Sequence, residues 1–189
     1  LNALRAVDNP FQDLPLAAFL RSPMGGLCDG DLLAIRMAHP KPSAPFHEAV
    51  WLAAGRAAED GDGAAVPSSL RARLREILDQ LDRWRALARM RPPVEVANAI
   101  LTGTAYEAWI AAQPNAAEAL DHLDYLRGLL ERLGRSDGAA HPLARCLALI
   151  ERAREREQSV GEMPGPTARQ PDAVHLLTIH KSKGLEFPI

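Results

Sequence analysis

This chain of 189 residues has little of what disulfide-rich, zinc-binding and membrane proteins need. Its two cysteines, Cys28 and Cys146, lie far apart and outside any C-x-x-C pattern, so neither a disulfide framework nor a zinc site is predicted. No apolar run reaches the length of a membrane span, and no signal peptide is recognisable. The formal charge of −2 gives no overall attraction to nucleic acid or to a membrane surface. We therefore predict a protein of the reducing cytoplasm that has no contact with a membrane.

The chain also lacks the sequence motifs that an enzyme would need to bind and hydrolyse ATP by itself. It has no G-x-x-x-x-G-K-[ST] phosphate loop and no strand that ends in paired acidic residues for magnesium. His175 and His180 are five residues apart, on an expected strand and its exit, where strand geometry separates their side chains. No metal site is predicted from them. The chain by itself is expected neither to hydrolyse ATP nor to cut DNA.

Helical periodicity dominates what is present, and 47% of the residues are hydrophobic. The spacing predicts helices over most of residues 1–160, which we expect to form an all-α body. Asp13 is expected to cap the second of these helices. The longest helix is predicted over residues 67–90, with Ser68 and Ser69 as candidate N-caps. Its apolar stripe consists of Leu70, Leu74, Ile77, Leu78, Leu81, Trp84 and Leu87.

Arginine outnumbers acidic residues on the outer face of this long helix. Arg71, Arg73 and Arg75 are candidate contacts to duplex DNA, because arginines gathered on one side of a helix attract phosphates. The alternative is an ordinary solvated face with ion pairs inside the helix, such as Asp79–Arg83 at i,i+4. Solvated faces of this kind are the commoner outcome, and both interpretations fit the sequence.

Residues 161–189 differ in composition from the helical part of the chain. Residues 161–171 hold three prolines and two glycines and are predicted to be a linker. The apolar run Val174–Ile179 then predicts a short strand buried on both faces. The loop after it contains Lys181 and Lys183, two of the three lysines in the chain, and it is either a phosphate site at the mouth of the strand or a solvated loop with incidental charges. Because the chain stops inside the next apolar run, we expect it to be a fragment.

Two stretches resemble one known family. TIHKSKGLEF, residues 178–187, resembles motif V of the UvrD/Rep class of superfamily 1 DNA helicases, in the form found in the AddA and RecB helicase–nuclease subunits. LRAVDNPFQDLPLAAFLRSP, residues 4–23, is similar to the stretch that opens the 2B subdomain of AddA. The helical segment LDQLDRWRALAR, residues 78–89, is also of the kind that AddA-type 2B subdomains carry, although it is less specific. The spacing of these stretches extends over essentially the whole chain.

The resemblance implies a fold and a role. Residues 1–160 would form a helical 2B insertion, and residues 172–189 would return the chain to a truncated RecA-like motor domain. The residues placed by resemblance at single-stranded DNA are Thr178, His180, Lys181 and Lys183. Those placed at the nucleotide are Gly184 and Glu186. ATP and magnesium would bind the parent enzyme rather than this piece, which would act on DNA beside a second helicase–nuclease subunit.

Three functions are compatible with these residues. The first is the 2B region of an AddA/RecB-like helicase–nuclease subunit that processes double-strand breaks for recombination. The second is the same region of a UvrD-like repair helicase without a nuclease, and the DNP and LRSP elements favour the first over it. The third is a helical protein-interaction scaffold that does not bind DNA.

Overall fold

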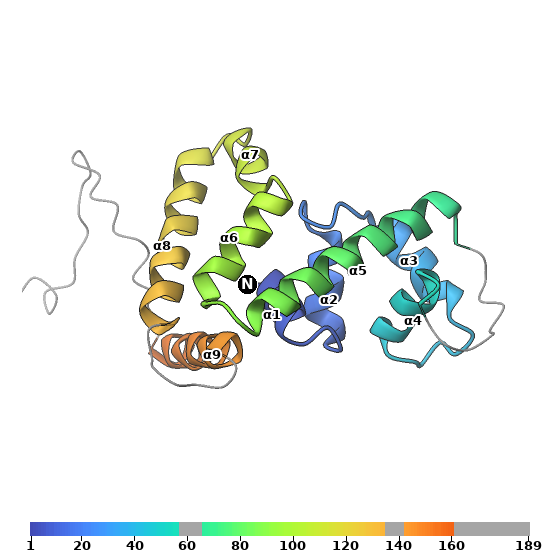
Figure 1. Cartoon of the computed structure of the whole chain (residues 1–189), viewed down its shortest axis with the longest axis horizontal. Coiled ribbons are helices and arrows are strands. Elements are labelled where there is room, and N and C mark those ends of the chain that lie inside the picture. Colours follow the sequence, from blue (N-terminus) through green and yellow to red (C-terminus); the bar gives the residue numbers. More distant parts are fainter. Residues whose placement is uncertain (57–65, 135–141, 161–189) are drawn as a thin grey trace, which may run out of the picture.

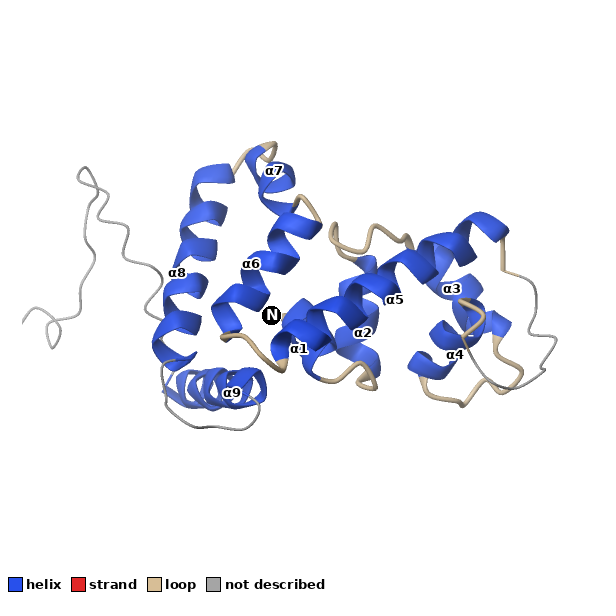
Figure 2. Ribbon diagram, viewed as in Figure 1, coloured by secondary structure: helices blue, strands red, loops and turns tan. Residues whose placement is uncertain are grey.

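The described part of the molecule is built from helices alone. The computed structural model describes residues 1–56, 66–134 and 142–160, and these residues contain no strand (Figures 1 and 2). The helices, in chain order, are α1 (Asn2–Asp8), α2 (Asp13–Arg21), α3 (Asp29–Ala38), α4 (Phe46–Ala53), α5 (Ser68–Ala88), α6 (Pro93–Gly103), α7 (Tyr106–Ala111), α8 (Ala116–Gly134) and α9 (Pro142–Val160). The expected all-α fold is confirmed for these ranges. The predicted linker and the predicted strand lie outside the described residues.

Helix α5 runs through the middle of the molecule and joins its two ends. It contacts α4 on one side of the molecule and α1 and α6 on the other (Figure 1). Of the apolar stripe predicted for it, only Leu87 remains partly exposed, and the other six side chains are buried. The serines predicted as N-caps do not cap this helix: Pro67 occupies the N-cap position and no side-chain cap bond forms. The periodicity therefore identified the buried face correctly but not the details of the helix start.

The hydrophobic interior has two parts of unequal size. The larger cluster draws buried residues from α1 through α6 and from α8 and α9. The smaller consists of Leu101, Ile110 and Leu123, which come from α6, α7 and α8. These three helices contact one another and form a lobe at one end of the molecule (Figure 1).

Asp13 does not cap its own helix, contrary to the sequence-based expectation. The N-cap of α2 is Gln12, and no side-chain cap bond forms there. The Asp13 carboxylate instead accepts hydrogen bonds from the backbone N–H of His47 at 3.0 Å and of Phe46 at 2.6 Å. Helix α4 needs this cap because Pro45, at its N-cap position, makes no side-chain cap bond. Asp13 thus ties α2 to the start of α4 through residues that are 33 and 34 positions away in the sequence.

The cap also perturbs the ionisation of Asp13. Burial alone would raise the pKa of this carboxyl, but the amides of Phe46 and His47 and the His47 ring, at 3.0 Å, lower the pKa below its usual value. A carboxyl whose pKa is lowered by folding stabilises the folded state above its unfolded pKa of about 3.9, and this stabilisation is lost as the pH falls through the folded-state pKa.

Replacing Asp13 with alanine should therefore destabilise the protein in a pH-dependent way. We expect the variant to lose about 0.5–2 kcal/mol of unfolding free energy at pH 7, the usual cost of removing a cap. The difference in unfolding free energy between the unmodified chain and the variant should shrink as the pH falls below about 4 and then through the lower folded-state pKa of Asp13. Urea unfolding at several pH values, followed by circular dichroism, measures this. Asp121→Ala is the matched control, because Asp121 is exposed within α8. If Asp121→Ala lowered the unfolding free energy as much, and with the same pH dependence, Asp13 could not be assigned as the cap of α4.

Candidate functional site

The three arginines predicted to contact DNA do not lie on one side of α5. Arg75 donates from Nε to the backbone carbonyl of Ala54 at 2.7 Å, at the end of α4. Arg73 reaches the opposite neighbour, the α2–α3 connection, where its Nη2 lies 3.4 Å from the carbonyl oxygen of Gly25. The Nε of Arg71 is buried, and no hydrogen-bond partner for it is found among the described residues. Arg73 and Arg75 therefore bind backbone carbonyls of the protein. Contact of the three arginines with DNA stays a prediction.

The ion pairs of α5 also differ from the expected pattern within the helix. Asp79 pairs with Arg56, which follows α4, rather than with Arg83. Arg56 also binds Asp82 at 2.7 Å, and Arg85 lies 3.9 Å from Asp82. Asp79 and Asp82 thus bind a cation from another part of the chain and help to hold α4 against α5, whereas Glu76 pairs within α5, with Arg73 at 3.3 Å.

Two arginines, Arg83 in α5 and Arg89 at the C-cap position of this helix, are better placed for an external anion. Arg83 and Arg89 are both exposed, and no ion pair involving either is found in the part of the chain that the structure describes. The sequence shows that arginine is frequent on the outer face of this helix but does not single out these two. Only the tertiary structure distinguishes these two arginines from the others, because it determines which carbonyls and carboxylates of neighbouring helices lie within reach of each side chain.

The residues assigned by resemblance to motif V lie outside the described residues. They are Thr178, His180, Lys181, Lys183, Gly184 and Glu186. Their roles at DNA and nucleotide stay predictions.

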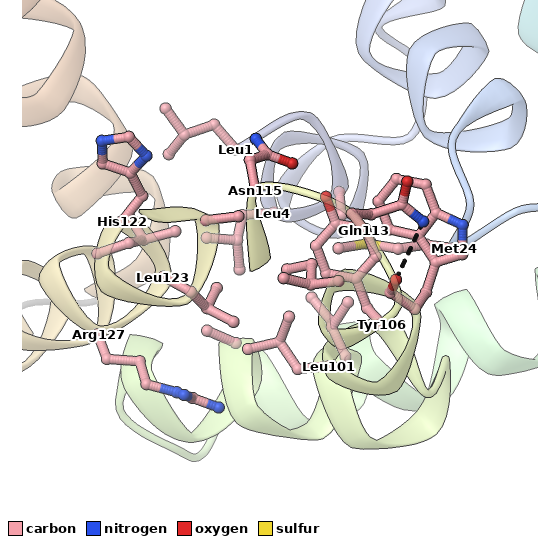
Figure 3. A pocket seen from close by; sticks show the side chains of 17 residues that line it. Leu1, Leu4, Met24, Leu101, Tyr106, Gln113, Asn115, His122, Leu123 and Arg127 are labelled. Atoms are coloured by element: carbon pink, nitrogen blue, oxygen red, sulfur yellow. Dashed lines mark hydrogen bonds between the residues drawn. The ribbon is translucent and has the colours of Figure 1, made fainter. Parts of the chain in front are cut away.

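A pocket between α1, α6, α7 and α8 was not predicted from the sequence. Its volume is about 490 Å³, and its wall is largely aliphatic (Figure 3). At its edge the rings of Tyr106 and Trp109 are stacked with their centroids 5.5 Å apart. The apolar spacing of these helices indicated burial, and nothing in the spacing distinguishes a packed interface from an open one.

Residues 1–56, 66–134 and 142–160 contain neither a membrane-spanning helix nor a group of metal ligands. No helix there is both long enough and apolar enough to cross a membrane. No group of three His, Cys, Asp or Glu side chains there is arranged to hold a metal ion.

Comparison with known proteins relates the chain to one kind of enzyme. It is 34% identical over 248 residues to the A subunit of the ATP-dependent helicase/nuclease of Moorella thermoacetica, a match that covers 100% of this chain and 17% of that protein. The proteins of the same name from Geobacillus thermodenitrificans and Bacillus licheniformis are 34% and 37% identical over 190 residues, again covering 100% of this chain and 14% of each relative. No family model matches the chain.

These relatives agree with the class of protein indicated by the two sequence motifs, that of the AddA-like helicase–nuclease subunits. The resemblance is confirmed: the chain belongs to this family, and over its whole length it is homologous to one segment of AddA, the A subunit of the ATP-dependent helicase/nuclease. The chain spans about a sixth of the length of these relatives or less.

Proposed function

We propose that this chain is the helical 2B segment of an ATP-dependent DNA helicase/exonuclease that acts in double-strand break repair and recombination in the cytoplasm. The observation that carries the proposal is similarity over the whole chain to proteins named as helicase/nuclease subunits. Those names favour a helicase–nuclease over a UvrD-like helicase without a nuclease. They also favour it over a helical scaffold that is unrelated to DNA.

In this proposal the helical body and the C-terminal motif V region have different roles. The helical body, residues 1–160, positions DNA, and residues 161–171 connect it to the motif V region at 172–189. There Thr178, His180, Lys181 and Lys183 contact the single strand, whereas Gly184 and Glu186 contact the nucleotide. A loop that touches both ligands couples the state of ATP to the grip on DNA, because each ligand then changes the affinity for the other. ATP and magnesium bind the complete enzyme, which works with a second subunit. The segment has no activity alone.

The exposed arginines of α5 make the DNA role measurable. Binding of a fluorescently labelled forked DNA to the 189-residue chain should weaken with salt, because each arginine–phosphate pair releases counterions. Changing Arg83 and Arg89 together to glutamate should lower the slope of log K against log salt by about 0.9 for each phosphate that is no longer neutralised. Changing Arg71, Arg73 and Arg75 to glutamate tests the contacts predicted from the sequence.

The controls separate DNA contact from damage to the fold. Arg152 and Arg154 are exposed on α9, so Arg152→Glu/Arg154→Glu makes the same change in charge away from α5. Because Arg73 and Arg75 hold backbone carbonyls, circular dichroism must show that the triple variant is still folded before its binding is interpreted. If the chain did not bind forked DNA at low salt, or if the α5 and α9 variants weakened DNA binding equally, α5 would have no role in positioning DNA.

A further inference from the structure

The C-terminal part of α5 and the turn that joins it to α6 are rich in positive charge. Residues 83–94 carry four arginines and no acidic residue, in a chain whose formal charge is −2. The two carboxylates that flank this stretch are already paired, because Asp82 binds Arg56 at 2.7 Å and Glu95 lies 3.7 Å from Arg91. The stretch is therefore expected to attract phosphates.

An exposed methionine lies within this positive stretch. Met90 is 78% exposed, and among the large apolar side chains of the described residues only Leu14 is more exposed. The negative end of the helix dipole favours arginines at a helix C-terminus, which accounts for Arg89 and Arg91 without any ligand. The dipole gives no reason for an apolar side chain there. One exposed methionine is ordinary by itself, so the argument depends on how Met90 lies relative to the arginines.

Met90 lies on the same side of the helix as Arg83. The N–H groups of Met90 and Arg91 both donate to the carbonyl of Leu87, at 3.0 and 2.9 Å, so the helical winding continues just past the end of α5. At about 3.6 residues per turn, seven positions make nearly two turns, which places Arg83 and Met90 on one side and roughly 10 Å apart along the axis. Between them Ala86 is exposed and leaves this side of the helix free of bulky groups.

A surface that combines exposed arginines with an apolar side chain favours one kind of DNA site. Phosphates bind the arginines, whereas the faces of the bases are what DNA offers to a methionine. In an intact duplex these faces are stacked on one another, and a protein that inserts a side chain must first unstack them. At a fork, the last base pair of the duplex already has one uncovered face, so Met90 can pack on it without unstacking.

We propose that Met90 packs against the last base pair of the duplex at a fork junction, while Arg83 and Arg89 bind the phosphates beside it. This inference rests on the proposed function, because it takes DNA as the ligand of α5. It adds an apolar contact that the arginines do not provide, and with it a preference for junctions over continuous duplex. The arginines supply affinity for any duplex, and the methionine distinguishes the junction.

Two labelled DNAs with the same duplex sequence test the proposal. One is a fork, and the other is a dumbbell whose two ends are closed by hairpin loops, so that it has no open junction. In anisotropy titrations with the 189-residue chain, Met90→Ala should weaken binding of the fork by about three- to tenfold, as expected for partial burial of one methionine side chain. Binding of the dumbbell should be unchanged. Met90→Leu keeps an apolar side chain of similar size and should retain most of the affinity for the fork.

A matched methionine provides the control, and its methyl group provides a second measurement. Met37 is 69% exposed on α3, so Met37→Ala removes an equally accessible methionine away from α5 and should leave binding of both DNAs unchanged. The chain has four methionines, and their ¹³C-labelled methyl groups give a simple NMR spectrum in which Met90→Ala identifies the Met90 signal. Ring currents of the bases should shift this signal when the fork is added but not when the dumbbell is added. The Met37 signal should stay in place with both.

The outcomes separate this inference from the proposed function. If Arg83→Glu/Arg89→Glu weakened binding of both DNAs but Met90→Ala changed neither, the junction contact would be wrong and the DNA-positioning role of α5 would stand. Equal weakening of fork and dumbbell by Met90→Ala would also overturn the inference, because Met90 would then contact continuous duplex. If the unmodified chain bound neither DNA at low salt, both the role of α5 in positioning DNA and the junction contact would be refuted.

Discussion

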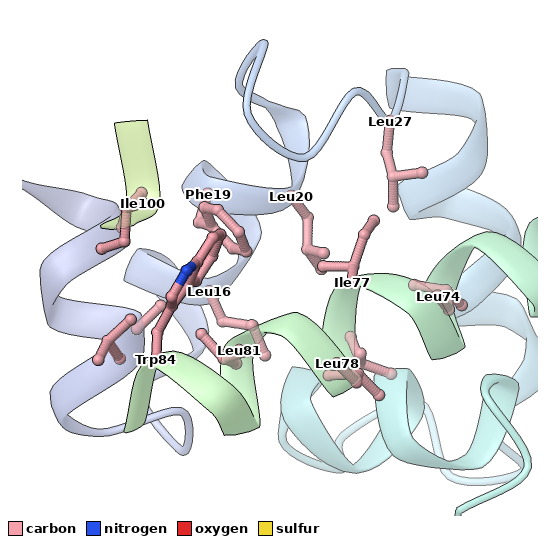
Figure 4. Packing of buried hydrophobic residues seen from close by; sticks show 14 of the residues in the cluster. Leu16, Phe19, Leu20, Leu27, Leu74, Ile77, Leu78, Leu81, Trp84 and Ile100 are labelled. Carbon is pink, nitrogen blue, oxygen red and sulfur yellow. The ribbon is translucent and has the colours of Figure 1, made fainter. Parts of the chain in front are cut away.

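Replacing Trp84 with alanine is expected to lower the free energy of unfolding by about 3–5 kcal/mol, the usual cost of removing a large buried aromatic side chain. Trp84 is 5% exposed and lies on α5, where its ring meets that of Phe19 edge-on with centroids 6.1 Å apart (Figure 4). Its removal leaves a cavity in the main hydrophobic cluster, at the part of α5 that also packs against α1 and α6. Urea unfolding followed by far-UV circular dichroism measures the change.

Trp109→Ala provides the matched control for this substitution. Trp109 is 45% exposed and its removal mainly abolishes the stack on Tyr106, so the same change of side chain should cost at most about 1 kcal/mol. Each variant keeps two of the three tryptophans, so their fluorescence can also be compared. Similar destabilisation by the two substitutions would show that α5 is not the structural centre of the fold.

Replacing Gly25 with alanine should also be strongly destabilising, although the substitution adds a single methyl group. A Cβ at this position would clash with the carbonyl oxygen of Leu20 and lie 2.6 Å from its Cα, and backbone atoms give way less readily than a flexible side chain. The approach is close because the chain folds back after α2, where the N–H of Leu27 bonds to the Leu20 carbonyl at 3.0 Å. We expect the free energy of unfolding to fall by about 1–3 kcal/mol or more, as for other overpacked sites.

Gly30→Ala is the corresponding control and should raise, rather than lower, the free energy of unfolding. Gly30 lies in the first turn of α3, and a Cβ there would meet only the Cys28 sulfur, at an ordinary 3.6 Å. Because alanine is favoured over glycine within a helix, this variant should gain up to about 1 kcal/mol. Thermal unfolding of both variants in the same buffer tests the pair, and a stabilised Gly25→Ala would show that the α2–α3 connection can move aside.

Much of the fold could be predicted because helical periodicity is a local property. The spacing of Leu74, Leu78 and Leu81 indicates which side of α5 is apolar, and that side is buried. Local spacing carries no information about which helix will cover that side. This is why Asp13 was assigned to its own helix rather than to α4, and why Asp79 was paired with Arg83 rather than with Arg56.

The candidate sites show the same division. The arginines of α5 are visible in the sequence, but only the tertiary structure shows that Arg75 binds the Ala54 carbonyl whereas Arg83 has no ion pair among the described residues. The absence of basic residues from 92 to 126 is likewise a property of the sequence. That this acidic stretch borders an apolar pocket depends on how α1 packs beside α6 and on how α6, α7 and α8 pack together.

The sequence by itself determined the helical class of the described residues, the buried face of α5 and, through two motifs, the relation to AddA-like helicase–nuclease subunits. Only the tertiary structure decided which polar groups pair across helices, which arginines remain exposed, and where a pocket stays open. The physical reason is the distance along the chain between the residues that interact. Helix formation and amphipathicity depend on residues a few positions apart, whereas caps, ion pairs and pockets depend on groups that only the packing of distant helices brings together.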